Sequence, residues 1–82
     1  MNTFSIIGKC KKIHKIGANK FIINVICNSR SDSLFTIPIH VANSNFISKI
    51  RENDLLGING IIDIHCMNII FIASKVIWLP EK

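Results

Sequence analysis

Apolar residues recur along this chain in short runs that are rich in β-branched and aromatic side chains, a composition that favours strands over helices. Between residues 34 and 41 they show the alternation of a strand, with Phe35, Ile37, Ile39 and Val41 on one face. Polar or glycine-containing segments separate the runs. The pattern predicts five strands, over residues 3–16, 21–27, 34–41, 55–65 and 69–79.

The first predicted strand does not keep a strict period of two. Its apolar positions slip after Gly8, which indicates a bend at that glycine or a β-bulge nearby. The segment Gly17-Ala18-Asn19-Lys20 predicts a tight turn, so the first two strands form a hairpin. A second tight turn is predicted at Met67-Asn68.

Residues 42–53 break the strand pattern. Asn43 or Ser44 can cap a helix, after which Phe46, Ile47 and Ile50 fall on one face. The order is therefore three strands, a short helix and two strands, which is that of the five-stranded OB barrel. We expect an all-β fold with one short helix between strands three and four, and a single domain over residues 1–82.

Composition narrows the class of protein. At 82 residues the chain is near the lower limit for a domain that folds alone, and its 49% hydrophobic and 18% charged residues exclude disorder as the main state. The formal charge is +5 and the pI about 9.5. This surplus favours an anionic partner, most often nucleic acid, although it could equally serve solubility.

Cysteine usage and the N-terminal segment indicate the compartment. Cys10, Cys27 and Cys66 are odd in number and far apart, which is typical of free thiols in a reducing environment. The N-terminus does not have the pattern of a signal peptide, and no apolar run reaches the roughly 18 residues that a membrane helix needs. We expect a cytoplasmic protein without membrane contact.

The sequence predicts no enzyme and no catalytic residue. Its histidines and cysteines lack the spacing of metal ligands, so we expect no metal and no cofactor. His65 and Cys66 are adjacent in a strand pattern and would point to opposite faces. The carboxylates form no close pair suited to acid–base catalysis, and Gly57 and Gly60 are not part of a phosphate-binding loop. No small-molecule substrate is expected.

Four segments, taken together and in order, resemble the bacterial and phage single-stranded DNA-binding proteins. Met1-Asn2-Thr3-Phe4-Ser5-Ile6-Ile7-Gly8-Lys9 is similar to the opening strand of that family. Phe35-Thr36-Ile37-Pro38-Ile39-His40-Val41 fits its third strand. Asn53-Asp54-Leu55-Leu56-Gly57-Ile58-Asn59-Gly60 is similar to its junction into strand four, and Ala73-Ser74-Lys75-Val76-Ile77-Trp78-Leu79 to its closing strand.

The resemblance implies an OB fold, binding of single-stranded DNA without sequence preference in replication, repair or recombination, and assembly as homodimers or homotetramers. The family's long hairpin between strands four and five is reduced here to His65-Cys66-Met67-Asn68, and its acidic C-terminal tail is absent from the sequence. A compact, tailless form such as primosomal replication protein N is therefore the better match. Contacts with replication proteins are a further expectation.

Binding a single strand requires cations for the phosphates and flat faces for the bases. Half of the basic residues lie on or beside the first hairpin, where they could instead protect a strand edge from aggregation. The resemblance gives Phe35 a base-stacking role, while Val41 stands where the next stacking aromatic would fall. The predicted nucleic-acid-binding residues are Lys9, Lys11, Lys12, His14, Lys15, Lys20, Arg30, Phe35, Lys75 and Trp78.

Two other functions remain open at this stage. The chain is so rich in isoleucine that strands apolar on both faces, such as those with Ile61-Ile62 and Ile69-Ile70, predict an interface, as in a module for oligomerisation or protein docking. An RNA-binding OB protein is the second alternative, although that class usually carries aromatic-rich strands. Competition between matched DNA and RNA oligomers distinguishes the RNA-binding protein from a DNA-binding one. A pull-down at high salt identifies a docking module, because apolar docking survives salt and phosphate contacts do not.

Overall fold

The computed structural model describes residues 2–28, 33–42 and 47–80. They form five strands and one 3₁₀ turn, in the order expected for an OB fold. The elements are β1 (Asn2–Gly17), β2 (Lys20–Asn28), β3 (Leu34–Ala42), η1 (Ile47–Lys49), β4 (Leu55–His65) and β5 (Asn68–Trp78). The predicted strands are confirmed, each to within about one residue at either end.

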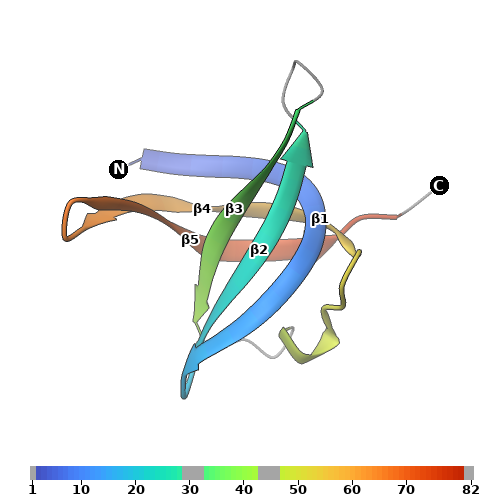
Figure 1. The fold of residues 1–82 in the computed structure, drawn as a ribbon, viewed down its shortest axis with the longest axis horizontal. Helices are drawn as coiled ribbons and strands as arrows, with labels where there is room; N and C mark the ends of the chain where they lie inside the picture. The colour runs from blue at the N-terminus through green and yellow to red at the C-terminus, as the bar shows by residue number, and fades with distance from the viewer. Residues whose placement is uncertain (1, 29–32, 43–46, 81–82) are drawn as a thin grey trace.

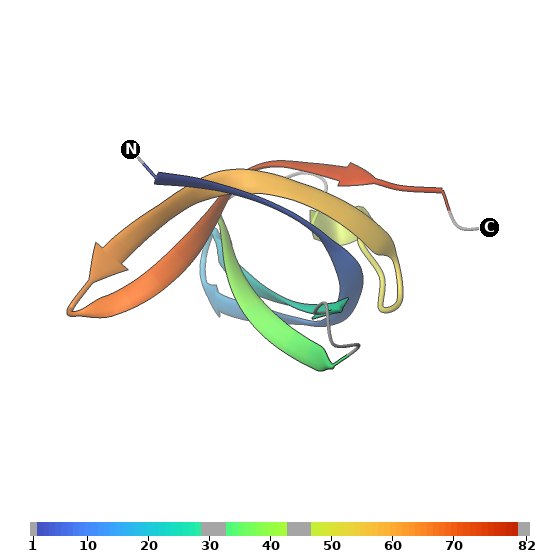
Figure 2. The same ribbon diagram turned by 90° about the horizontal axis from the view of Figure 1, so that it is seen from above.

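The strands close into a barrel in the order β1-β2-β3-β5-β4. Two sheets cross in Figures 1 and 2: the second half of β1 lies with β2 and β3, and its first half lies with β4 and β5. β1 therefore belongs to both sheets, and it changes partner near Lys9, which pairs with both Ile26 and Leu55. The parallel contact of β3 with β5 at Ile39 and His40 closes the barrel.

Gly8 permits the bend of β1. A Cβ atom built on Gly8 would lie 2.5 Å from the carbonyl oxygen of Ile26 and 2.5 Å from Cγ1 of Val25. Any side chain at this position would therefore push β1 away from β2. The bend that the sequence predicts at Gly8 is confirmed, and a bulge follows it, since the pairing with β2 shifts between Cys10 and Lys12.

The core consists of aliphatic side chains and the two thiols of Cys10 and Cys27, and all five strands and the 3₁₀ turn contribute to it. Ile23, Ile39 and Leu56 are completely buried, and Ile47 and Ile50 cover one end of the core. Phe4 and Phe71 are partly buried against the core and pack edge to face with each other, with ring centroids 5.2 Å apart. These contacts confirm an all-β, five-stranded OB barrel.

Two details of the prediction are wrong. The helix predicted over residues 42–53 is a single 3₁₀ turn in the part that the structure describes, while Asn43, Ser44 and Phe46 lie outside that part. A 3₁₀ turn repeats every three residues, so Ile47 and Ile50 still face the core together. The second tight turn is at Cys66-Met67, one residue earlier than predicted, and Asn68 already pairs with His65.

Candidate nucleic-acid interface

The outer surface of β1, β2 and β3 carries a set of basic and polar side chains in register. Three lateral rows cross these strands: Lys9–Ile26–Thr36, Lys12–Asn24–Pro38 and His14–Ile22–His40. Lys20 follows on the same side, beyond His14. We call this surface the basic face and define it by Lys9, Lys12, His14, Lys20, Ile22, Asn24, Ile26, Thr36, Pro38 and His40.

The β-bulge in β1 decides which lysines share this face. Lys9 and Lys12 are three residues apart, so a regular strand would point them to opposite sides. The register shift between Cys10 and Lys12 adds one residue, Lys11, and returns Lys12 to the outer side. Cys10 and Ile13 consequently both face the interior, where Cys10 is completely buried.

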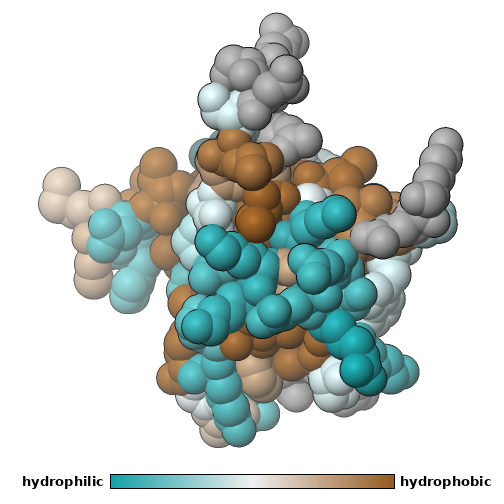
Figure 3. All heavy atoms as spheres, turned by 45° about the vertical axis from the view of Figure 1, so that its right-hand side comes forward, coloured by the Kyte–Doolittle hydropathy of each residue, from teal (hydrophilic) through white to brown (hydrophobic). Residues whose placement is uncertain are grey.

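The strands that form the basic face carry lysines and no carboxylate. The sequences of β1, β2 and β3 contain no Asp and no Glu. Figure 3 shows a broad hydrophilic area on the side of the molecule that β1 presents, with hydrophobic side chains bordering it. Cations gathered on one surface attract a polyanion over a distance of about one Debye length, roughly 8 Å at physiological salt.

The other cations of the first hairpin lie at the edges of the basic face. Lys11 is the extra residue of the bulge and is exposed. Lys15 is exposed at the end of β1, where its register partner Phe21 lies on the inner side of β2. Arg30 lies outside the described residues. The hairpin thus brings most of the predicted cations to one region of the molecule.

The two predicted stacking aromatics do not lie on the basic face. Phe35 pairs with the buried Cys27 and Trp78 pairs with the buried Leu56, so both belong to the inward positions of their strands. Each is at the end of its strand and is 43% exposed, so neither is shut inside. A polynucleotide on the basic face would reach Phe35 only by passing over the end of the barrel.

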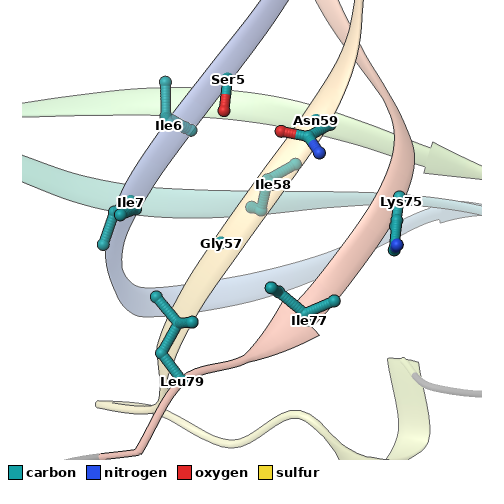
Figure 4. Close-up of a pocket in the computed structure, with 9 residues that line it drawn as sticks. All are labelled: Ser5, Ile6, Ile7, Gly57, Ile58, Asn59, Lys75, Ile77 and Leu79. Carbon is teal, nitrogen blue, oxygen red and sulfur yellow. The ribbon is translucent and has the colours of Figure 1, made fainter.

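Lys75 lies on the second sheet, away from the basic face. It pairs with Asn59 on the outer surface of β1, β4 and β5, beside a hollow of about 230 Å³. Figure 4 shows Ser5 and Asn59 at one end of this hollow and Ile7, Ile77 and Leu79 at the other. The hollow is lined by polar and apolar side chains and by one cation, Lys75. The basic face, by contrast, carries several lysines.

The structure adds residues to the candidate interface that the sequence did not single out. Asn24, Thr36, Pro38 and His40 face outward beside the predicted lysines, and Ile22 lies between the two histidines. The alternation of β2 and β3 carried this signal, because each residue lies next to a buried one such as Ile23 or Ile39. The alternation shows which residues face outward, but it does not show which of them lie beside the lysines of β1. That depends on the register between strands, which the sequence alone does not supply.

The described residues offer little reactive chemistry. Cys10 and Cys27 are buried thiols, and Cys66 is exposed. Burial raises the pKa of the Cys10 thiol, with smaller contributions from the carboxylates of Asp54 and Glu52, and burial also raises the pKa of the Cys27 thiol. In the described part of the chain, no three His, Cys, Asp or Glu side chains are grouped to hold a metal ion, and no helix is long and apolar enough to cross a membrane.

Comparison with known proteins gives a match in structure only. No protein-family model matches the sequence, and no curated relative matches it. The chain superposes on the dimeric N-terminal domain of PriB from Thermoanaerobacter tencongensis with a TM-score of 0.78 and 18% identity, covering 98% of both chains. PriB from Ralstonia solanacearum gives a TM-score of 0.72 and 10% identity, covering 95% of this chain and 97% of the other.

This chain has the OB fold of the PriB proteins. PriB is primosomal replication protein N, the compact type that the sequence resembles, so the resemblance stated from the sequence is confirmed at the level of the fold. Since a fold carries many functions, the function must be argued from the site.

Proposed function

We propose that this protein binds single-stranded DNA without sequence preference, on the basic face. The observation that carries the proposal is the alignment of Lys9, Lys12, Lys20 and two histidines on one surface of three strands that contain no carboxylate. The PriB fold supports it, because OB folds bind oligonucleotides on the outer surface of their strands two and three.

The lysines would supply most of the affinity. Each ammonium group that neutralises a phosphate releases condensed counterions, which makes binding favourable and strongly dependent on salt. Lys9 and Lys12 would hold the backbone along β1, and Lys20 would extend the contact past the turn of the hairpin. Contacts to phosphates carry no information about the base, which accounts for tolerance of sequence.

The bases would lie on the rings and apolar side chains of the same face. His14 and His40 offer flat imidazoles, and Ile22 and Pro38 offer apolar surface between them. Stacking on such groups accepts any base, because every base has a π-face. Phe35 and Trp78, exposed at the end of the barrel, would contribute only to a longer strand that passes over that end.

We further propose that the protein acts in DNA replication in the cytoplasm, as one domain and as a homodimer. The dimeric PriB domain from Thermoanaerobacter tencongensis supports the homodimer, and the PriB fold supports the role in replication. Tetramers and contacts with other replication proteins stay predictions. On this proposal the protein is a binding protein and not an enzyme.

The decisive experiment is fluorescence anisotropy of a labelled oligo-dT across a titration of NaCl. We expect tight binding at low salt and a linear fall of log K with log salt, of about 0.7 per neutralised phosphate. Lys12→Gln and Lys20→Gln should each lower this slope by about 0.7. Lys49→Gln, on the exposed 3₁₀ turn, is the matched control and should leave the slope unchanged. Absence of binding at low salt would reject the proposal.

Competition by unlabelled oligomers tests the choice of polymer. We expect dA, dC and dT oligomers to compete within a small factor of one another, and duplex DNA to compete poorly because its bases are not available for stacking. Stronger competition by RNA than by DNA of the same sequence would favour the RNA-binding alternative.

A further inference from the structure

The contact that closes the barrel is short. In the described part of the chain, β3 pairs with β5 only at Ile39 and His40, whereas it pairs with β2 as far as Ala42. Figures 1 and 2 both show β3 and β5 meeting over a short stretch and diverging on either side of it. A pocket of about 170 Å³ lies beside this contact. We call it the β3–β5 pocket and define it by Lys20, Phe21, His40, Val41, Ala42, Ile70 and Ile72.

The β3–β5 pocket adjoins the basic face. Lys20 and His40 belong to both, and Lys20 is exposed. His40 pairs with Ile72 across the closure of the barrel, so the row His14–Ile22–His40 continues onto β5. A polynucleotide that Lys20 holds on the basic face would therefore lie beside the opening of the pocket.

The walls of the β3–β5 pocket are apolar. Ile70 and Ile72 are two residues apart, so they lie on the same side of β5, and both are partly buried. Phe21 and Val41 contribute from β2 and β3. Apart from the two residues shared with the basic face, no side chain in this lining has a hydrogen-bonding group. The lining therefore suits a group with apolar faces and does not recognise the polar edges of that group.

Phe21 brings a phenyl ring to the pocket. It follows Lys20 directly in β2 and is partly buried against the core. Its place in the lining shows that part of the side chain reaches the pocket. Because Phe35 and Trp78 do not lie on the basic face, Phe21 supplies next to it the kind of ring on which bases stack.

The size and charges of the β3–β5 pocket indicate its ligand. Its volume is below the roughly 300–1,000 Å³ of pockets for drug-sized ligands, so it suits a group of one or two rings. A polynucleotide on the basic face carries such groups beside its phosphates. Lys20 lies on the β2 side of the pocket, whereas the carboxylate of Asp63 belongs to the register partner of Ile70 on the β5 side. A phosphate is therefore favoured on the β2 side, and its base would point toward β5.

We propose that the β3–β5 pocket holds one base of the bound single strand, unstacked from its neighbours and in contact with Phe21 and Ile72, while Lys20 holds the phosphate beside it. The inference rests on the proposed function and adds to it a site for a single base. Because the lining recognises no base edge, the pocket accepts any base, in keeping with binding without sequence preference.

NMR of protein labelled at the isoleucine Cδ1 methyl groups tests the proposal directly. Titration with oligo-dT at low salt should shift the signals of Ile70 and Ile72, because the ring current of a bound base acts on nearby methyl groups. The signal of Ile22 reports binding on the basic face, and that of Ile77, on the second sheet, should not move. A shift at Ile22 without one at Ile70 and Ile72 would overturn the pocket and leave the proposed function standing. No shift at any isoleucine would reject both.

Filling the pocket gives a second test. Ala42 is exposed and lines the pocket, so Ala42→Leu should occupy it without disturbing the core. Affinity for oligo-dT should fall about fivefold or more, as expected for the loss of one stacked base. The slope of log K against log salt should stay unchanged because no cation is lost, in contrast to Lys20→Gln. Ser74→Leu, at an exposed position of β5 outside the pocket and the basic face, is the matched control. Unchanged affinity of Ala42→Leu would overturn the proposal.

Replacement of Phe21 tests the ring itself. Phe21→Leu keeps an apolar side chain against the core, and it should also lower the affinity about fivefold at an unchanged salt slope. Phe21→Tyr keeps the ring and should bind as the wild type does. Circular dichroism checks the fold of both variants. Equal losses of affinity in the two variants would show that Phe21 acts only through the core and would overturn its contact with the base.

Discussion

His14 and His40 lie on either side of Ile22 in one row of the basic face, although they are far apart in the sequence. Neighbouring strands are about 4.8 Å apart, so the backbones that carry the two imidazoles are separated by roughly 10 Å. The two imidazole rings and the isoleucine between them therefore lie side by side on the candidate interface.

Replacing either histidine of this row should weaken DNA binding without affecting the fold. His14→Ala and His40→Ala should each cost about 1–3 kcal/mol if the ring stacks on a base. The effect should persist at high salt, where phosphate contacts are reduced. Affinity for oligo-dT at two salt concentrations measures it, with His65→Ala, at the exposed end of β4, as the control. Equal losses in the control would remove the argument for stacking on this row.

Gly8→Ala should destabilise the barrel, while Gly17→Ala should not. The added Cβ at Gly8 would be 2.5 Å from both Ile26 O and Val25 Cγ1, and such overpacking costs about 1–3 kcal/mol. At Gly17 the nearest atom, Cβ of Lys20, is 3.6 Å away, so the loss of unfolded-state entropy should dominate and add up to about 1 kcal/mol of stability. Urea unfolding of the two variants compares them, and equal midpoints would contradict the close approach of β1 to β2.

Thiol titration should separate one cysteine from the other two. Cys66 is exposed in the turn between β4 and β5, whereas Cys10 and Cys27 are buried and have raised pKa values. Since the thiolate is the reactive form, a thiol-specific reagent at neutral pH should label Cys66 quickly and the buried pair only on unfolding. Cys66→Ser should abolish the fast phase. Fast labelling of that variant would show that β1 or β2 opens readily.

Stability should decline at alkaline pH through Cys10. Its backbone N–H donates to the carbonyl oxygen of Asp54 at 2.9 Å, which holds the thiol in the core near the carboxylates that help to raise its pKa. The unfolded thiol loses its proton near its ordinary pKa of 9.0, while the folded one retains it to higher pH. Above that pH the unfolded state binds fewer protons, so the free energy of unfolding falls by at most about 1.4 kcal/mol per pH unit for this thiol.

The Cys10→Ala variant isolates this contribution. It should be less stable than the wild type below pH 9, because a buried side chain is truncated. Its stability should then fall less steeply as pH rises above about 9, because it lacks the shifted thiol. Parallel pH dependences of the two proteins, measured by chemical denaturation, would exclude the thiol as the cause.

Local patterns were sufficient for most of the fold. The alternation around Ile37 and Ile39, and the glycine at position 8, predict the strands and the bend of β1 because the pleat and the steric limits of the backbone act over a few residues. The turn at Cys66-Met67 was placed one residue late, since polarity does not show which residues adopt a positive φ. The expected helix is reduced to the turn Ile47–Lys49 in the described residues, because apolar spacings of three and four residues are hard to tell apart in so short a segment.

The candidate site shows what the sequence determined and what only the tertiary structure decided. The sequence by itself determined the excess of lysines in the first hairpin and the lack of carboxylates in the first three strands. Only the tertiary structure decided that Lys9 and Lys12 share a face, that His40 joins His14, and that Phe35 and Trp78 lie on inward positions. The reason is that a bulge and the register between strands depend on pairing with distant segments, and a shift of one residue moves every following side chain to the other face.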